Sequence, residues 1–226
     1  MTAAFVKRNP LPGSDAPFRE AEGLAALARL LEGAEIGVPR VLAVDEKALT
    51  LEAIERGSWS DAAWSRLGRG LAALHAKWGA SYGLARDNYL GASPQPNRPA
   101  ARFGPFFLEY RLRFQVRRVR RGDLRRAFLA VLEAVGGRLA EYLDAHCEGP
   151  SPLHGDLWAG NVLCGRDGRV WLIDPAFYFG DREADLAMTE LFGGFGEAFL
   201  PRLRRLPAAQ PRVPPASGRS STCTTA

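Results

Sequence analysis

The chain has 226 residues, of which 46% are hydrophobic, and a formal net charge of +5. This composition excludes a wholly disordered chain and suits one sizeable domain or two small lobes. No apolar stretch approaches the roughly 20 residues of a transmembrane helix, and the N-terminus lacks the basic-then-apolar order of a secretory signal. Three unpatterned cysteines, Cys147, Cys164 and Cys223, argue against a disulfide framework and indicate the reducing cytoplasm.

Residues 1–56 predict a small sheet with one helix. The helix covers residues 18–31, because Leu24, Leu27 and Leu31 recur at spacings of three and four. Acidic residues in its first turn suit the positive end of the helix dipole. Three strands are predicted, at residues 4–9, 41–44 and 48–54.

Residues 57–200 predict a larger and mainly helical unit. Its first helix ends at Trp78 and begins at Ser60 or Asp61, either of which suits a helix cap. Residues 79–105 form a loop by their glycine and proline content. Two helices are then predicted, at residues 105–120 and 123–146. The apolar side chains of the second, which we expect to be buried, are Leu124, Phe128, Leu132, Val135, Leu139 and Leu143.

Arginine is concentrated between Arg111 and Arg126. Such a cluster can bind phosphate, nucleic acid or another acidic partner. The solvated face of a helix pair is favoured, because no alternation of aromatic and basic residues accompanies the arginines. We therefore expect no nucleic-acid partner. Four aromatic residues just upstream are expected to lie in the core: Phe103, Phe106, Phe107 and Tyr110.

The stretch 153–175 predicts a loop followed by a β-hairpin. Two apolar runs, residues 162–164 and 170–173, flank a turn rich in glycine. A further helix is predicted to include Asp185 and to end near Leu191. Residues 201–226 lack aromatic and acidic side chains and contain several prolines, so this tail is predicted to be disordered.

The loop and hairpin carry the residues for phosphoryl transfer from ATP. Asp156 is followed by Asn161 five residues later, and Asp174 closes the second apolar run. Protein kinases place a catalytic base, a metal-binding Asn and a metal-binding Asp in the same order. Gly155 and Pro175 replace the kinase Arg and Phe, which favours a small-molecule kinase. We therefore expect Asp156 to accept a hydroxyl proton, with Asn161 and Asp174 binding Mg²⁺.

A lysine upstream completes this pattern. Lys7 on the first strand would contact the ATP phosphates, and an acidic residue on the next helix would hold it. Glu20 is the chosen partner and Glu22 the alternative, because residues two apart point to different helix faces. His154 is predicted to support the loop by hydrogen bonds, and Asp185 to hold the loop backbone.

These motifs resemble the fructosamine kinase, or ketosamine-3-kinase, family. The main landmarks are the run from Leu153 to Asn161, which includes Trp158, the segment Ile173-Asp174-Pro175-Ala176, and the run from Gly180 to Phe195. Further landmarks are Phe5-Val6-Lys7, Asp87-Asn88-Tyr89-Leu90-Gly91, Pro94-Gln95-Pro96-Asn97 and Phe106-Phe107. The resemblance extends from about residue 5 to about residue 199.

The resemblance implies an α+β, two-lobed protein-kinase-like fold with a mainly helical C-terminal lobe. It implies ATP-dependent, Mg²⁺-dependent phosphorylation of a sugar hydroxyl on a small ketosamine or a glycated lysine. The 3-phosphate product of this family is unstable and releases the amine, so the implied role is deglycation. We also expect the protein to be a cytoplasmic monomer. Trp158 and the loop 87–97 are then candidates for contact with the sugar substrate.

Two departures from the family leave a second reading open. The glycine-rich segment that covers ATP would precede Lys7, but Met1 lies only six residues before it, so the N-terminal lobe is expected to be truncated. The tail after about Phe199 also differs, which suggests an altered reading frame or a truncation. The alternative is a catalytically impaired kinase-like fragment or binding protein.

Overall fold

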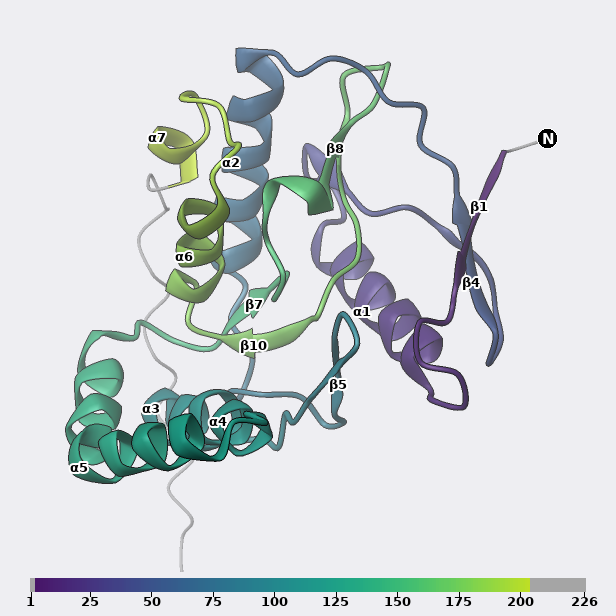
Figure 1. The fold of residues 1–226 in the computed structure, drawn as a ribbon. Helices are drawn as coiled ribbons and strands as arrows, with labels where there is room; N and C mark the ends of the chain where they lie inside the picture. Colours follow the sequence, from purple (N-terminus) through teal and green to yellow (C-terminus); the bar gives the residue numbers. More distant parts are fainter. Residues whose placement is uncertain (1–2, 204–226) are drawn as a thin grey trace, which may run out of the picture.

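A computed structural model of the chain describes residues 3–203. At one end of the molecule, three antiparallel strands form a sheet in the order β1-β4-β3 (Figure 1). Helix α1 contacts β3 and β4. The three strands and the helix that were predicted are confirmed, with bounds shifted by at most two residues. These elements are β1 (Ala4–Arg8), α1 (Ala16–Leu30), β3 (Val41–Val44) and β4 (Ala48–Glu52).

Helix α1 links this sheet to the rest of the fold. Leu24 and Leu27 on its inner face are almost fully buried in the main hydrophobic cluster. Between them and the helix start, the buried Gly23 lies so close to Phe177 that an added Cβ would be 3.3 Å from the Cβ of that residue. The absence of a side chain at Gly23 therefore lets α1 rest directly on the chain that follows Asp174.

Helix α2 (Asp61–His75) is capped by Ser60, whose Oγ accepts a hydrogen bond of 3.2 Å from the N–H of Ala63. Of the two predicted caps, Ser60 is the one that the structure uses. The short helix α7 (Leu200–Leu203) packs against α2, with Leu203 buried. The prediction of disorder from residue 201 is therefore wrong for residues 201–203, because Leu203 finds an apolar partner surface. The remainder of that predicted tail lies outside the described residues.

The predicted loop 79–105 contains a β-hairpin, so that prediction is wrong for part of the segment. The hairpin consists of β5 (Asn88–Leu90) and β6 (Ser93–Gln95), paired antiparallel. Its inward side chains are amides, not the apolar residues that reveal a strand by alternation. The hairpin could therefore not be predicted from alternating hydrophobic residues.

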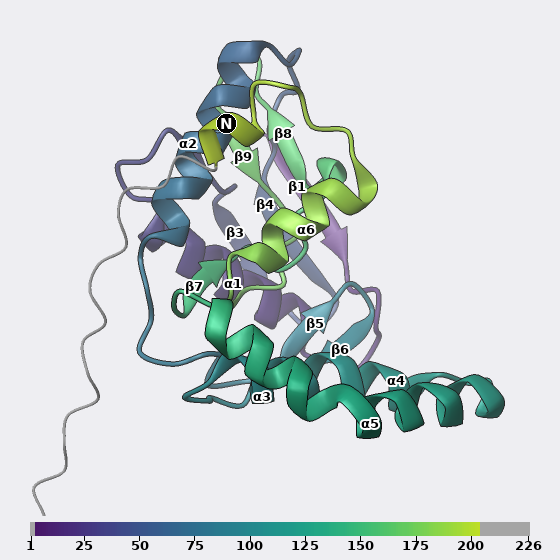
Figure 2. The ribbon, with the colours of Figure 1, turned by 90° about the vertical axis from the view of Figure 1, so that its left-hand side faces the viewer.

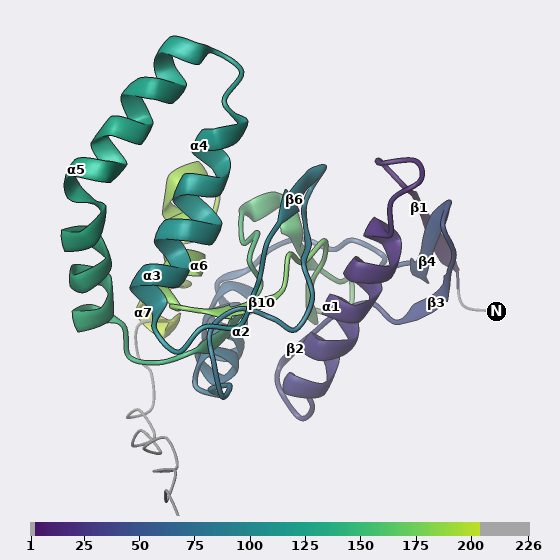
Figure 3. The ribbon, with the colours of Figure 1, turned by 90° about the horizontal axis from the view of Figure 1, so that it is seen from below.

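The predicted helix 105–120 is built from three consecutive pieces, of which the middle one is a π-helix. The pieces are α3 (Phe103–Phe107), the π-helix η1 (Leu108–Arg113) and α4 (Phe114–Arg118). Helix α5 (Gly122–His146) lies along them, and this group projects at the end of the molecule opposite the β1-β4-β3 sheet (Figures 2 and 3).

The predicted buried face of α5 is wrong at its first two positions. Leu124 and Phe128 expose 37% and 47% of their surface. Leu132 is buried, as predicted, and the other two buried positions are Gly136 and Ala140, which are small enough for η1 and α3 to approach closely. Close packing of the helices therefore uses small residues that the apolar pattern did not include. The predicted core aromatics Phe103 and Phe106 are buried, as expected.

The remaining strands set the stretch 153–175 against the core. The predicted hairpin is confirmed as β8 (Val162–Cys164) and β9 (Val170–Leu172), and β9 also pairs in parallel with β2 (Ile36–Gly37). Strand β7 (Ser151–Leu153) pairs antiparallel with β10 (Tyr178–Gly180). Because β7 precedes the Asp156 loop and β10 follows Asp174, this pairing holds both carboxylates in one region. Helix α6 (Glu183–Phe192) then packs behind the loop through the buried Asp185 and Leu186.

The other expectations from composition concern membranes, cysteines and domain limits. Within residues 3–203, the structure contains no helix with the length and apolarity needed to cross a bilayer. Cys147 and Cys164 are both buried, and no disulfide joins them within the described residues. The predicted boundary at residue 56 falls in the connection between β4 and α2, and the division into domains there stays a prediction.

Candidate active site

Asp156 and Asn161 lie at the two ends of the loop between β7 and β8. The amide Nδ2 of Asn161 donates to the backbone oxygen of Asp156 at 2.9 Å and to its carboxylate Oδ2 at 3.0 Å. A short 3₁₀ helix, Ala159–Asn161, brings the two residues this close. The amide oxygen is then the atom of Asn161 that can coordinate a cation.

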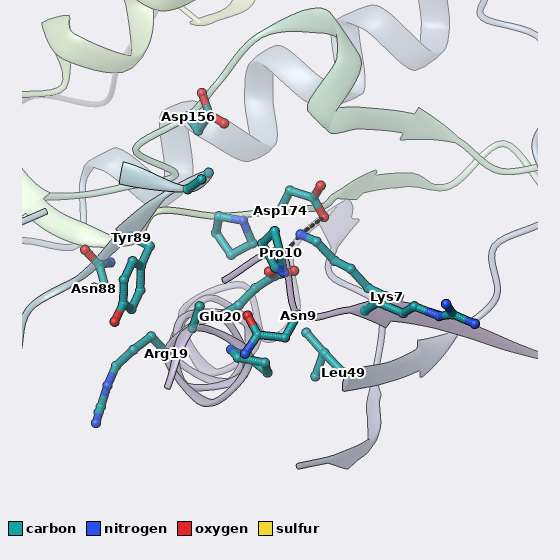
Figure 4. Close-up of a pocket in the computed structure, with 16 residues that line it drawn as sticks. Lys7, Asn9, Pro10, Arg19, Glu20, Leu49, Asn88, Tyr89, Asp156 and Asp174 are labelled. Carbon is teal, nitrogen blue, oxygen red and sulfur yellow. Dashed lines mark hydrogen bonds and ion pairs between the residues drawn. The ribbon is translucent and has the colours of Figure 1, made fainter. Parts of the chain in front are cut away.

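Asp174 follows β9 with a φ of +55°, the left-handed region that residues other than glycine rarely adopt. Its Oδ1 lies 3.1 Å from the Nζ of Lys7, and this same Nζ donates to Glu20 at 2.7 Å. Figure 4 shows Lys7 reaching from β1 to Asp174, with Asp156 on the other side of the opening. Three segments of the chain, β1, α1 and the residues after β9, thus bring one ammonium group to two carboxylates.

The structure places Glu20, and not Glu22, against Lys7. Glu22 points elsewhere and pairs with Arg19 at 2.8 Å and with Arg86 at 3.5 Å. Burial opposes the charge on Lys7, but the two neighbouring carboxylates outweigh it and raise the pKa of the ammonium group. Lys7 is therefore charged at neutral pH and suited to hold an anionic group.

His154 and Asp185 support the loop from behind. The Nε2 of His154 lies 2.8 Å from the backbone oxygen of Ile173, to which it donates, and its Nδ1 accepts from the N–H of Asp156 at 3.3 Å. Burial lowers the pKa of His154, so the ring is neutral, in agreement with one donating and one accepting nitrogen.

The carboxylate of Asp185 accepts the N–H groups of His154 at 2.8 Å and of Gly155 at 2.9 Å. It also contacts Nε2 of the buried His75 at 3.0 Å. Burial alone would raise the pKa of Asp185, but the hydrogen bonds from His75 and the loop lower it below the usual value. The geometry agrees with the supporting positions expected for His154 and Asp185.

Gly155 is required where it stands, between the supporting His and Asp156. Its φ is +82°, and an added Cβ would collide with the carbonyl group of Ala176. The kinase-type Arg that the sequence lacks here would not fit this backbone. The tight approach, together with the bond from Ala176 N–H to the His154 oxygen at 2.9 Å, fastens the Asp156 loop to the Asp174 segment.

Lys7, Glu20, Asp156 and Asp174 all line one cavity, between the loop that follows β1 and the β5–β6 hairpin. The hairpin contributes four further lining residues, Asn88, Tyr89, Gly91 and Ala92. Trp158, predicted to be on the substrate side, is exposed on the same loop as Asp156 and packs against Phe192, with ring centroids 6.2 Å apart. It is not among the residues that line this cavity, so its contact with a substrate stays a prediction.

The donor set suits Mg²⁺ shared with a nucleotide. No cluster of three or more His, Cys, Asp or Glu side chains able to hold a metal alone was found among residues 3–203. Mg²⁺ is typically bound by one or two carboxylates together with substrate phosphates, and not by an all-protein cage. Asp174, partly exposed to the cavity, and the amide oxygen of Asn161 are oxygen donors of that kind.

The predicted location of Arg111 is wrong. It was expected on a solvated helix face, but its guanidinium carbon lies 4.1 Å from the ring centroid of Tyr178 and 4.7 Å from that of Phe106. It also donates to the oxygen of Pro96 at 2.6 Å. The aromatic residues one helical turn upstream were the signal that this arginine, unlike its neighbours, has apolar partners.

Comparison with known proteins identifies relatives of this chain. The family model for fructosamine kinase matches residues 1–210. A curated protein from Synechocystis, named a probable ketoamine kinase, is 38% identical over 212 residues, which cover 92% of this chain and 70% of that protein. One of the same name from Thermus thermophilus is 41% identical over 202 residues, covering 85% and 66%. The chain thus spans about two thirds of the length of these relatives.

Solved structures give the same assignment. A crystal structure described as a fructosamine-3-kinase from Haemophilus somnus aligns with a TM-score of 0.76 at 30% identity, covering 89% of this chain and 68% of that one. Another from Thermobifida fusca aligns with a TM-score of 0.74 at 36% identity, covering 90% and 69%. The gentamicin complex of APH(2″)-IIa shares the fold alone, with a TM-score of 0.56 and 16% identity. The chain therefore has an α+β, protein-kinase-like fold and belongs to the fructosamine kinase family.

Proposed function

We propose that this chain transfers the γ-phosphoryl group of ATP to a sugar hydroxyl of a ketosamine, with Asp156 as the catalytic base. The observation that carries the proposal is the convergence of Lys7, Asp156 and Asp174 on one cavity in a member of the fructosamine kinase family. Three cysteines without the spacing of a disulfide framework suit a reducing compartment, so we place the reaction in the cytoplasm.

The side chains divide the chemistry among them. The acceptor hydroxyl oxygen attacks the γ-phosphorus, the bond from that phosphorus to the β–γ bridging oxygen breaks, and ADP leaves. The hydroxyl proton passes to the carboxylate of Asp156, which Asn161 orients. Lys7, held by Glu20, neutralises phosphate charge as that charge moves to the leaving group.

Asp174 and Asn161 are the residues that would hold Mg²⁺. The ion would offset the negative charge of the ATP phosphates during transfer. Asp174 would then be available to the cation as well as to Lys7, and Glu20 would remain the partner of Lys7. The ketosamine acceptor includes the small-molecule form and a glycated lysine on a protein. Release of the amine from its unstable 3-phosphate would make the outcome deglycation.

Two measurements on the full chain test this function. We expect Mg²⁺-ATP to raise the melting temperature saturably, because a ligand at 100 times its Kd stabilises the folded state by about 2.7 kcal/mol. We also expect ADP release with fructosyl-lysine as acceptor and none with lysine. Binding of ATP without turnover of any ketosamine would contradict the acceptor assignment. No binding of ATP would favour the impaired kinase-like protein.

The pH dependence of kcat/KM should report the state of Asp156. Burial raises the pKa of this carboxyl, and the hydrogen bond from Asn161 offsets this only in part. A base must be deprotonated, so we expect activity to fall as the pH decreases through this raised pKa, above the ordinary Asp value of about 3.9. His154, with its lowered pKa, should contribute no transition near neutrality. Initial rates across pH check this, and activity that persists unchanged to about pH 4 would contradict it.

A further inference from the structure

Three buried side-chain amides form a hydrogen-bonded network beside the cavity, and the reaction above assigns them no task. Asn88, Gln95 and Asn97 expose only 6%, 5% and 0% of their surface. The Oδ1 of Asn88 accepts from Nε2 of Gln95 at 2.9 Å and from Nδ2 of Asn97 at 2.6 Å. Buried amides are costly unless they are bonded, so the mutual bonds fix each of the three in one orientation.

Two of these amides also bond to the backbone just after Asp174. Gln95 donates from Nε2 to the oxygen of Ala176 at 3.1 Å, and Asn88 donates from Nδ2 to the oxygen of Phe177 at 2.9 Å. The segment between Asp174 and the start of β10 has no regular structure of its own. Hydrogen bonds from the side chains of the β5–β6 hairpin therefore hold this segment, which lacks the backbone hydrogen bonds of a paired strand.

Asp174 needs such support because of its backbone. A left-handed conformation is unfavourable for a residue other than glycine, so the flanking chain must hold it. On the N-terminal side, His154 binds the oxygen of Ile173. On the C-terminal side, the support comes from Gln95 and Asn88.

Arg111 closes the network. Its Nη2 donates to Oδ1 of Asn97 at 2.7 Å, while its guanidinium group stacks on Tyr178, the first residue of β10. Arg111 lies in the π-helix η1, a type of turn that often occurs at functional sites. The hairpin is thus tied to the end of the same segment that begins at Asp174.

The hairpin reaches the phosphate side as well. The hydroxyl of Tyr89 donates to Oδ1 of Asp15 at 2.9 Å, and Asp15 directly precedes α1, which carries Glu20. In Figure 4, Asn88 and Tyr89 lie on the side of the opening away from Lys7. The β5–β6 hairpin therefore contacts both segments that supply a carboxylate to Lys7: the start of the α1 helix, which contains Glu20, and the chain after Asp174.

We propose that Gln95, Asn88 and Asn97, held by Arg111, are positioning residues for Asp174, and that they set its affinity for the nucleotide-bound divalent cation. They act through the carbonyl groups of Ala176 and Phe177 and touch no reacting atom. The inference rests on the proposed function, in which Asp174 is a Mg²⁺ ligand. Loss of partners that orient a metal ligand typically costs about 10–100-fold in metal affinity or activity.

The test uses Gln95→Met, which keeps the length of the side chain and removes both of its donated bonds. The Kd for Mn²⁺ in the presence of ADP is measured by electron paramagnetic resonance, alongside the melting temperature. We expect Mn²⁺ to bind about tenfold or more weakly. Arg111→Lys, which keeps the charge and loses the planar fork, should shift the Kd in the same direction.

A matched control separates positioning from stability. Ser60→Ala removes the cap of α2 and should lower the melting temperature, but it should leave the Mn²⁺ affinity unchanged. If Gln95→Met and Arg111→Lys both bind Mn²⁺ within about twofold of wild type, the positioning role is wrong. If Gln95→Met does not fold, the Kd of Arg111→Lys decides. Wild type that shows no saturable Mn²⁺ binding with ADP would contradict the proposed function itself, and the inference with it.

Discussion

Asp156→Asn is expected to lower kcat by on the order of 10²–10⁴-fold, the range typical for loss of a positioned general base. The amide cannot accept the hydroxyl proton, but its oxygen can still accept the bond from Nδ2 of Asn161. The loop geometry should therefore survive, and the Kd for Mg²⁺-ATP should change little. Single-turnover rates with fructosyl-lysine, together with nucleotide titrations, measure the two effects separately.

The same substitution should not destabilise the fold. The pKa of Asp156 is raised in the folded chain, mainly by burial, so its ionised form is less favourable there than in the unfolded chain at neutral pH. A neutral amide removes this penalty, and we expect a melting temperature equal to or above that of wild type. Asp61→Asn, at an exposed position in the first turn of α2, is the control and should leave kcat unchanged. Normal turnover by Asp156→Asn would show that another group is the base.

The elements that the sequence predicted well are those stabilised by local or periodic features. Strand β1 and helix α1 follow from an apolar run and from leucines at helical spacing. The pairing of Lys7 with Glu20 could be predicted because Glu20 and Glu22 lie two residues apart and so point to different faces of the helix. Only one of them can reach the strand that carries Lys7. Asp156, Asn161 and Asp174 indicated phosphoryl transfer because their order and spacing along the chain match those of the kinase residues, and spacing can be read from a sequence.

The elements that were missed depend on partners distant in the chain. The β5–β6 hairpin is fixed by amides that bond to Ala176 and Phe177, more than 80 residues away in the sequence. In the sequence, Arg111 resembles the other arginines of its cluster. Only in the folded chain does its guanidinium group stack on Tyr178. For α5, both the apolar stripe and the small-residue stripe were possible contact faces, and only the partner helices decide between them. Amino-acid composition and hydrophobic periodicity do not show which distant residues will contact one another.

Asp174→Asn is expected to reduce kcat/KM by about 10³-fold or more, because a ligand of the cation that offsets phosphate charge is lost. Asn is the informative substitution at this position. It tolerates the left-handed backbone at least as well as Asp, so the φ of +55° can be kept while the charge is removed. Lys7 keeps its bond to Glu20, so the fold around β1 and α1 should remain.

Dependence on the cation distinguishes this effect from that at Asp156. Activity of Asp174→Asn should rise with Mg²⁺ far above the concentration that saturates wild type, whereas Asp156→Asn should saturate normally and stay slow. Asp123→Asn, on the exposed start of α5, is the matched control for loss of one negative charge. Saturation of Asp174→Asn at the wild-type Mg²⁺ concentration would remove Asp174 from the cation site. Because Asp174 alone among the candidate ligands contacts Lys7 within residues 3–203, that outcome would instead make it a partner of the lysine.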